Sequence, residues 1–155
     1  MLTLTRNVYD EIVDHALRDH PIEVCGVVLR RPHEDHTARV VRFRNTAQSP
    51  VFHEADSRDL YKVYRDMAER QEELHIVYHS HTASEAYPSA IDVELAQEPS
   101  AHNLIISTAP RTFLELRSFL ITDGVVAEED VHIMEGRRAA RVSPPKRGPA
   151  AGGPS

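Results

Sequence analysis

The residues best suited to chemistry lie close together in the middle of the chain. His79 and His81 end an apolar run, and Ser89 and Asp92 follow after a segment rich in turn-forming residues. Side chains two residues apart on an extended backbone leave from the same face, so the two imidazoles can converge on one point. Two imidazole nitrogens joined by a carboxylate suit a zinc ion. The spacing therefore predicts a metal site.

Two elements must meet to form this site. Residues 74–78 are apolar, β-branched or aromatic, which predicts a largely buried strand that ends in the histidines. Ser89, just after Pro88, marks the expected start of a helix, with Asp92 in its first turn. A sharp reversal between strand and helix would bring the Asp92 carboxylate over the two histidines as a third ligand. A fourth position would then remain for water.

Each signal also has a purely structural explanation. Ser89 followed three residues later by Asp92 is a common helix N-terminus, where the serine caps free amides and the acid complements the helix dipole. Histidines at the end of a strand often only hydrogen-bond to backbone. The combination of both signals in one short stretch is rarer, and it favours the metal site.

The same stretch carries a resemblance to a known family. His79-Ser80-His81, seven further residues, Ser89, two more and Asp92 resemble the HxHx7SxxD core of the JAMM (MPN+) metalloproteases. These are zinc isopeptidases that cut after the C-terminal glycine of ubiquitin-like proteins. The similarity extends over roughly residues 1–135.

The family also requires a glutamate far upstream, next to a strand, and Glu23 in HPIEVCGVVL fits this requirement. By position alone Glu23 would be interpreted as a solvated acid at a strand end, because acids there are common. The resemblance instead implies that it is the general base. It further implies a single catalytic Zn²⁺ held by His79, His81 and Asp92, with Ser89 as a donor to the developing oxyanion.

The wider sequence of residues 78–99 is most similar to small bacterial members of the family that remove cysteine from a sulfur-carrier protein. The resemblance thus implies hydrolysis after the C-terminal Gly-Gly of a ubiquitin-like sulfur carrier. The product would be cysteine or another small extension, which connects the protein to cysteine biosynthesis. We expect the carrier tail to lie extended beside a sheet edge, near residues 39–52 or 82–87.

Three other functional classes share the ligand types or the fold implied here. Non-haem iron oxygenases also use two histidines and one carboxylate, but usually as His-x-Asp with a distant histidine. A non-catalytic scaffold of the same fold would not need the five residues of the motif, all of which are present. Deaminase chemistry needs a Pro-Cys-x-x-Cys pair, whereas this chain has one cysteine.

The flanking pattern predicts an α/β fold, a mixed sheet packed with helices. Helices are expected over residues 5–20 and 56–72, the second with Tyr64 in the core at helical spacing. Residues 45–52 should form a loop. The resemblance implies the same class, a JAMM/MPN domain of the cytidine-deaminase-like type. The strands are expected at residues 24–29, 39–43, 74–78, 104–107, 113–121 and 125–134, the last two joined by a hairpin turn at 122–124.

Composition predicts one domain, residues 1–135, and a disordered tail, residues 136–155. The tail holds four prolines, four glycines and five basic residues without an acid, so it cannot bury a core. Without those five, 13 of the chain's 18 basic residues face 24 acidic ones. The tail has no aromatic residue to stack on bases, so we expect no nucleic-acid partner.

The chain is expected to act in the cytoplasm, away from membranes. No secretory signal is recognisable, and no apolar run approaches the length that spans a bilayer. The one cysteine, Cys25, rules out an internal disulfide and fits a reducing compartment. Because Cys25 lies in an apolar run, we expect it to be a small buried hydrophobic residue rather than a nucleophile.

Overall fold

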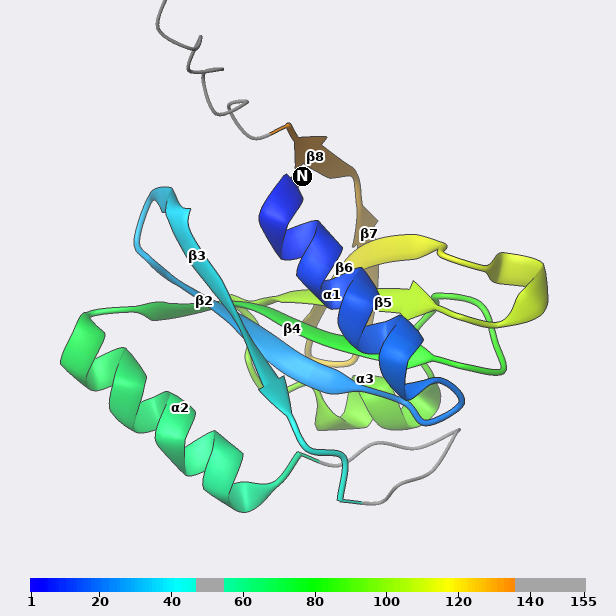
Figure 1. Cartoon of the computed structure of the whole chain (residues 1–155), viewed down its shortest axis with the longest axis horizontal. Helices are drawn as coiled ribbons and strands as arrows, with labels where there is room; N and C mark the ends of the chain where they lie inside the picture. The colour runs from blue at the N-terminus through cyan, green and yellow to red at the C-terminus, as the bar shows by residue number, and fades with distance from the viewer. Residues whose placement is uncertain (47–54, 136–155) are drawn as a thin grey trace, which may run out of the picture.

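A six-stranded mixed sheet forms the centre of the molecule (Figure 1). The computed structural model describes residues 1–46 and 55–135. Across the sheet the strands follow the order β3-β2-β4-β5-β6-β7, and among these neighbours only β4 and β5 are parallel. The strands are β2 (Cys25–Arg31), β3 (Glu34–Phe43), β4 (Glu73–His81), β5 (His102–Ser107), β6 (Leu116–Thr122) and β7 (Val125–Glu129). The predicted mixed α/β architecture is confirmed.

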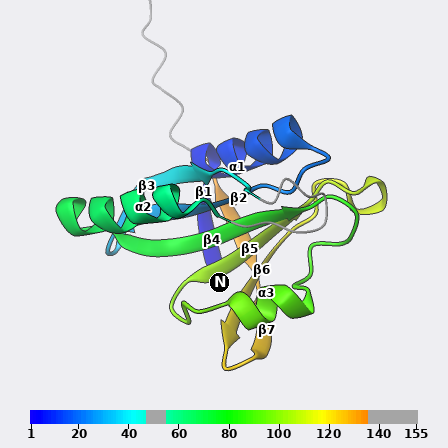
Figure 2. The same cartoon turned by 90° about the horizontal axis from the view of Figure 1, so that it is seen from below.

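Helices cover both faces of this sheet. Helix α1 (Arg6–Asp19) packs on one face together with strand β1 (Leu2–Thr5), which pairs in parallel with β8 (Val131–Met134). Helices α2 (Ser57–Arg70) and α3 (Ala90–Leu95) pack on the opposite face. Figure 2 shows α1 and α3 on opposite sides of the sheet.

Each helix has its own apolar cluster with the strands beneath it. Alternation along β4 separates the clusters, because Ile76 and Tyr78 face α1 whereas Val77 faces α2. Helix α3 packs over β5 and β6 through Val93 and Ala96. The fully buried side chains of the α1 cluster include Leu2, Leu4, Ile12, Ala16, Val24, Val28, Leu104 and Ile106.

The ends of the two long helices follow from local sequence. The Thr5 hydroxyl accepts a hydrogen bond from the Val8 amide at 3.5 Å and caps α1. The Asp56 carboxylate does the same for α2 through the Arg58 amide at 2.8 Å. Both predicted helices are therefore confirmed within one or two residues at each end.

Two predicted strand boundaries were wrong. Strand β3 begins at Glu34 instead of residue 39, because the chain reverses in a tight turn with His33 at φ 63° and pairs with β2 directly after it. Strand β6 begins at Leu116 instead of residue 113. Residues 110–112 form a short 3-10 helix, and Leu114 at φ 62° cannot continue a strand.

The N-terminal strand β1 was missed, and the segment 125–134 was wrongly predicted as one strand. The hairpin at residues 122–124 is confirmed, with Asp123 and Gly124 both at positive φ. Beyond Glu129 the chain leaves the main sheet, and β8 pairs with β1 instead. This pairing is long-range, so the local pattern of either segment contained little signal for it.

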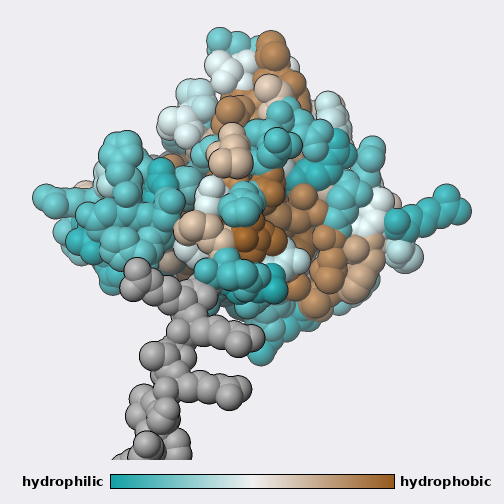
Figure 3. Space-filling view, turned by 90° about the horizontal axis from the view of Figure 1, so that it is seen from above, coloured by the Kyte–Doolittle hydropathy of each residue, from teal (hydrophilic) through white to brown (hydrophobic). Residues whose placement is uncertain are grey.

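Hydrophilic and apolar residues occupy different parts of the molecular surface. In the space-filling view from above, the left-hand side over the β2–β3 hairpin is hydrophilic, and apolar residues gather towards the centre and the right (Figure 3). At the hairpin, Arg30 forms ion pairs with Asp35 and Glu73. Within the described residues, no helix is long and apolar enough to cross a membrane. The predicted basic tail and most of the predicted loop at 45–52 lie outside the described residues.

One buried polar contact ties α1 to the central strand. The Tyr78 hydroxyl lies 2.7 Å from Nδ1 of His15, and both side chains are buried. Tyr78 reaches this position across Gly26, where a Cβ atom would lie 2.5 Å from the Tyr78 hydroxyl and 2.5 Å from the Val41 carbonyl oxygen. Cys25, on the other face, is buried as predicted, and burial raises the pKa of its thiol to about 12.

We predict that His15 makes the protein less stable in mild acid. Burial, with a smaller contribution from Arg42, lowers the pKa of His15 from 6.5 to about 4, against the opposing charges of Asp19 and Asp14. Between those two values the unfolded chain binds a proton that the folded chain does not. Stability should therefore fall as the pH falls from about 6.5 to about 4, by up to ~1.4 kcal/mol per pH unit from this group.

The test is the free energy of unfolding as a function of pH, measured by urea denaturation in chelator-containing buffer. His15→Gln keeps a hydrogen-bonding group for Tyr78 but cannot titrate, so its curve should be flatter than that of the wild type in this window. His36→Gln serves as a control because the His36 side chain is 79% exposed. Parallel curves for His15→Gln and the wild type would contradict the prediction.

Candidate metal centre

The C-terminal end of β4 presents two imidazoles on one face. Nε2 of His79 and Nε2 of His81 lie 3.1 Å apart, and both side chains are buried. Ser80 between them points to the other face of the sheet, as the two-residue period of a strand requires. The predicted convergence of the two histidines is therefore what the structure contains.

Helix α3 returns the third group to the same point. Its N-cap is Ser89, which forms a capping box with Asp92: the Asp92 amide donates to Ser89 Oγ at 3.1 Å, and the Ser89 amide donates to Asp92 Oδ2 at 2.8 Å. The same Oδ2 atom lies 3.2 Å from Nε2 of His79 and 3.1 Å from Nε2 of His81. The capping interaction thus orients the carboxylate towards both imidazoles.

A backbone contact orients the ring of His81. Its Nδ1 lies 2.8 Å from the carbonyl oxygen of Glu85, in the loop between β4 and α3. A carbonyl only accepts hydrogen bonds, so Nδ1 carries a proton, and in the neutral ring Nε2, the atom nearest the other two groups, keeps a lone pair for a metal ion. This arrangement is typical of histidines that bind a metal.

The charges in the cluster depend on each other. Burial acts to lower the pKa of His81, but the hydrogen bonds to Asp92 and to the Glu85 carbonyl outweigh it and raise that pKa above 6.5. Burial acts to raise the pKa of Asp92, but the hydrogen bonds from His79 and His81 hold it far below 3.8. Asp92 is therefore ionised across the physiological range, as a metal ligand must be.

The donor set fits a divalent metal ion. His79, His81 and Asp92 offer ligand atoms that all lie within 4.8 Å of one another, and they are the one such group within the described residues. Two imidazole nitrogens and one carboxylate oxygen, with no thiolate, suit zinc in a site that keeps an open position. The same three groups also exist in iron sites, so the ligands alone do not select between the two metals.

Glu23 lies beside this cluster. It precedes β2 by two residues and is 4% exposed, so the interpretation as a solvated acid is wrong. Cys25 pairs with His79 across the β2–β4 ladder, and continuing the register by two residues places Glu23 opposite His81 on the same face. The charge of Glu23 accordingly contributes to the raised pKa of His81. The structure therefore brings all five predicted site residues to one end of β4.

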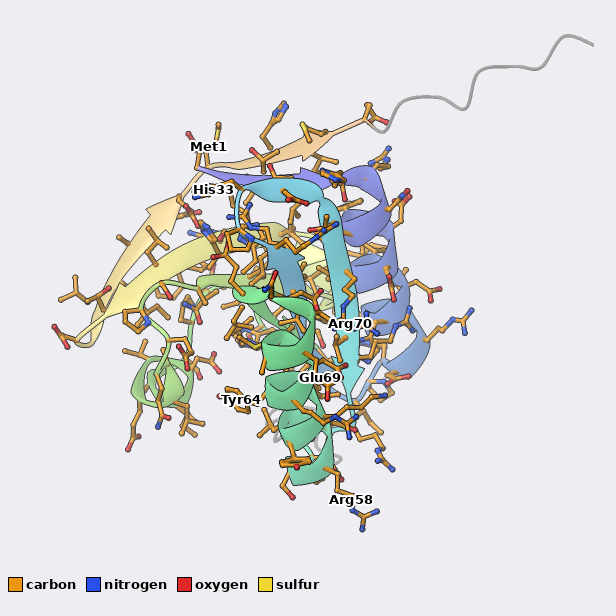
Figure 4. The ribbon with its side chains drawn as sticks, turned by 90° about the vertical axis from the view of Figure 1, so that its left-hand side faces the viewer. Met1, His33, Arg58, Tyr64, Glu69 and Arg70 are labelled. Carbon is orange, nitrogen blue, oxygen red and sulfur yellow. The ribbon has the colours of Figure 1, made fainter. Side chains whose placement is uncertain are left out.

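A groove between α2 and α3 leads to the cluster. His79 and Asp92 line it, and its floor includes Val77 and Ile105 of the sheet. Leu95 of α3 and Tyr64 of α2 form its sides. Figure 4 shows Tyr64 on the side of α2 that faces α3, with Glu69 and Arg70 on the other side of the helix.

Tyr64 is the residue that the sequence interpretation missed. Its helical spacing with Val63 and Met67 predicted a place in the core, but the structure leaves it 57% exposed at the groove. A tyrosine with one polar end at the margin of an apolar stripe is typical of a binding surface. The polar hydroxyl of Tyr64 could have indicated a surface position, whereas its helical spacing did not.

The sequence is similar to a known protein family and to individual known proteins. Residues 5–121 match the family described as prokaryotic homologues of the JAB domain. The chain is 43% identical over 135 residues to a CysO-cysteine peptidase of Mycobacterium tuberculosis (strain ATCC 25618 / H37Rv), covering 87% of this chain and 92% of the relative. It is also 33% identical over 115 residues to a desampylase of Haloferax volcanii, covering 68% of this chain and 80% of the relative.

A solved structure agrees on the fold. The JAB1/MPN domain protein AF2198 of Archaeoglobus fulgidus matches with a TM-score of 0.56 at 14% identity, covering 87% of this chain and all of that one. At this identity the match speaks for the architecture alone.

We predict that Asp92→Ala removes high-affinity zinc binding. Loss of a hydrogen-bonding partner outside the ligand set can lower metal affinity by about 10- to 100-fold, so loss of a ligand should lower it by at least ~100-fold. Zinc affinity can be measured by competition with a chromophoric chelator. Glu94→Ala is the matched control, since Glu94 is exposed on the same short helix. Equal zinc affinity in the Asp92→Ala variant and the control would contradict the assignment.

Proposed function

From the premise that this chain belongs to the family of prokaryotic JAB-domain homologues and is a JAMM-type hydrolase, we propose its substrate and cofactor. The protein is a zinc-dependent peptidase that hydrolyses the bond after the C-terminal Gly-Gly of a ubiquitin-like sulfur-carrier protein. It releases cysteine or another small C-terminal extension. The peptidase domain is residues 1–135, and the compartment is the cytoplasm, which suits a chain whose single cysteine can form no internal disulfide.

One observation carries this proposal. A single carboxylate oxygen, Oδ2 of Asp92, lies within hydrogen-bonding distance of Nε2 of both His79 and His81, and the buried Glu23 lies close enough for its charge to raise the pKa of His81. A purely structural cluster would not need an additional buried acid beside it. The names of the M. tuberculosis and H. volcanii relatives support a protein substrate of the ubiquitin-like class.

The residues divide the chemistry between them. A zinc ion held by His79, His81 and Asp92 would supply a Lewis acid for the scissile carbonyl and lower the pKa of water. Glu23 accepts the proton of the attacking water and then delivers it to the leaving amine. Burial of Glu23 keeps that proton transfer away from bulk solvent.

Ser89 is the donor for the developing oxyanion. Its Oγ accepts the Asp92 amide proton at 3.1 Å, which leaves the hydroxyl proton for another acceptor. The side chain is fixed because it also caps α3. A preorganised donor of this kind is worth on the order of 3 kcal/mol in the transition state.

The carrier tail binds in the groove between α2 and α3. The groove is lined by both apolar and polar side chains and leads to His79 and Asp92, so an extended segment lying in it would present its last carbonyl to the metal centre. Side chains from both helices flank this path, which favours glycine at the last two positions of the tail. The groove differs from the two sheet edges expected from sequence, although it lies next to the loop at residues 82–87.

We expect Glu23→Gln to remove most, but not all, of the hydrolytic activity while zinc remains bound. Removal of a general base lowers kcat by about 100-fold or more, whereas no metal ligand is changed. The substrate is the sulfur carrier of the same organism with a C-terminal cysteine after Gly-Gly, and the products are weighed by mass spectrometry. A non-catalytic scaffold would leave carrier–cysteine intact with the wild type as well. Release of a lysine-linked protein but not of cysteine would contradict the proposed small leaving group.

The groove yields a separate prediction. Tyr64→Ala should raise KM by roughly 2- to 10-fold with little change in kcat, because it removes an aromatic contact to the tail and leaves the metal centre intact. Tyr61→Ala is the matched control: Tyr61 is 70% exposed on the same helix and does not line the groove. Steady-state kinetics with the carrier–cysteine substrate measures both. Equal KM values for the two variants would exclude the groove as the path of the tail.

A further inference from the structure

The peptide group between Glu23 and Val24 is held at both of its polar ends by side chains. The Glu23 carbonyl oxygen accepts a hydrogen bond from Nδ2 of Asn45 at 2.7 Å. The Val24 amide donates to Oγ of Ser80 at 2.8 Å. Because a peptide group is planar, two bonds on opposite sides fix the orientation of the whole plane.

The contact with Ser80 replaces a bond of the regular sheet ladder. Ser80 donates its own amide to the Val24 carbonyl at 3.0 Å, as in an antiparallel pair. The return bond from the Val24 amide goes to the Ser80 hydroxyl, where a regular pair would use the Ser80 carbonyl. Both residues are buried, with Ser80 at 0% and Val24 at 1% exposure, so loss of the hydroxyl would leave a buried amide without this acceptor.

The position of Ser80 connects the base to the metal ligands. Ser80 lies between His79 and His81 in the chain, but its side chain points to the opposite face of β4. It therefore contacts neither ligand group, and it bonds to the residue that follows the general base. A shift of β4 that moved the imidazoles would move the Glu23 backbone with them.

Asn45 approaches from a third part of the chain. It lies between β3 and α2, in an isolated β-bridge with Ala55. Its side chain bonds to the carbonyl of Glu23, a residue 22 positions earlier in the sequence. Asn45, two residues after the end of β3, is thereby attached to the backbone of the site.

We propose that Ser80 and Asn45 are positioning residues that set the direction of the Glu23 carboxylate by fixing the Glu23–Val24 peptide plane. The inference rests on the proposed function, in which Glu23 is the general base. Both residues bond to the backbone of the site, Ser80 to the Val24 amide and Asn45 to the Glu23 carbonyl. Rotation of this plane swings the Glu23 side chain, and a misplacement of about 1 Å in a reacting group can lower a rate by ~100-fold.

The first experiment uses the zinc-loaded enzyme and carrier–cysteine. Ser80→Ala and Asn45→Asp should each lower kcat by roughly 10- to 100-fold and leave KM unchanged. Aspartate has nearly the shape of asparagine but offers no donor to the Glu23 carbonyl, and Asn45→Ala tests the same loss without an added charge. Ser80→Thr restores a hydroxyl and should recover most of the lost kcat. Zinc affinity, measured by chelator competition, should stay at the wild-type value in all four variants.

Two controls separate positioning from a general loss of stability. Ser118→Ala removes another hydroxyl at 0% exposure, one that donates to Glu129 at 2.8 Å, so it should lower stability without lowering kcat. In a Glu23→Gln background, Ser80→Ala should cause no further loss of activity, because its effect passes through the base. An additive loss in the double variant would overturn the proposal.

Crystal structures of zinc-loaded Ser80→Ala and Asn45→Asp decide the matter independently of activity. The Glu23 carboxylate should be displaced from its wild-type position while His79, His81 and Asp92 are not. A wild type that cuts no carrier would refute the proposed function, and these structures would still test the positioning role. Wild-type kcat in both variants, or an unmoved Glu23, would refute the positioning role alone.

Discussion

The site depends on three groups that are unfavourable neighbours without a positive charge between them. Two imidazole nitrogens lie 3.1 Å apart, and one carboxylate oxygen approaches both at 3.1–3.2 Å. Lone pairs that point at one another repel, so a proton or a cation must compensate them. The raised pKa of His81 and the lowered pKa of Asp92 show that the cluster favours a positive charge on the histidine and a negative charge on the carboxylate. A divalent ion bound between the three groups would compensate all of their lone pairs at once.

The sheet topology explains why these groups meet. Strands β4 and β5 are parallel, so the chain must cross over between them, and α3 begins beyond the C-terminal end of β4. Residues in the first turn of α3 therefore return to the histidines. Strand β2 runs antiparallel to β4, which places its beginning at the same end. Asp92, in the crossover between β4 and β5, and Glu23, just before β2, thus meet at one end of β4 although they are distant in sequence.

Local sequence was sufficient to predict the part of the site formed by residues 79–92, which are close together in the chain. The two-residue period of His79 and His81 and the capping signal at Ser89 predicted both elements and their meeting. The role of Glu23 was different, because its burial follows from the pairing of β2 with β4, and by position it looked solvated. Tyr64 was misplaced for the opposite reason: its spacing was that of a core residue, and only the space between α2 and α3 makes it accessible. Strand β1 has four residues and pairs with β8, so its own pattern did not reveal it, and the pattern of 125–134 did not reveal that the chain changes sheets after Glu129.

The capping role of Ser89 and Asp92 and their proposed role at the metal site are compatible, and they depend on each other. Helix α3 has six residues, too few to be stable in isolation, so it relies on its cap and on Val93 and Ala96 packing over β5 and β6. The capping box that begins the helix also restricts the Asp92 side chain, because Oδ2 accepts the Ser89 amide. Entropy that a free carboxylate would lose on binding an ion is therefore lost already when the helix forms. The helix cap and the proposed ligand site are therefore not alternatives, since the cap orients the carboxylate that would bind the ion.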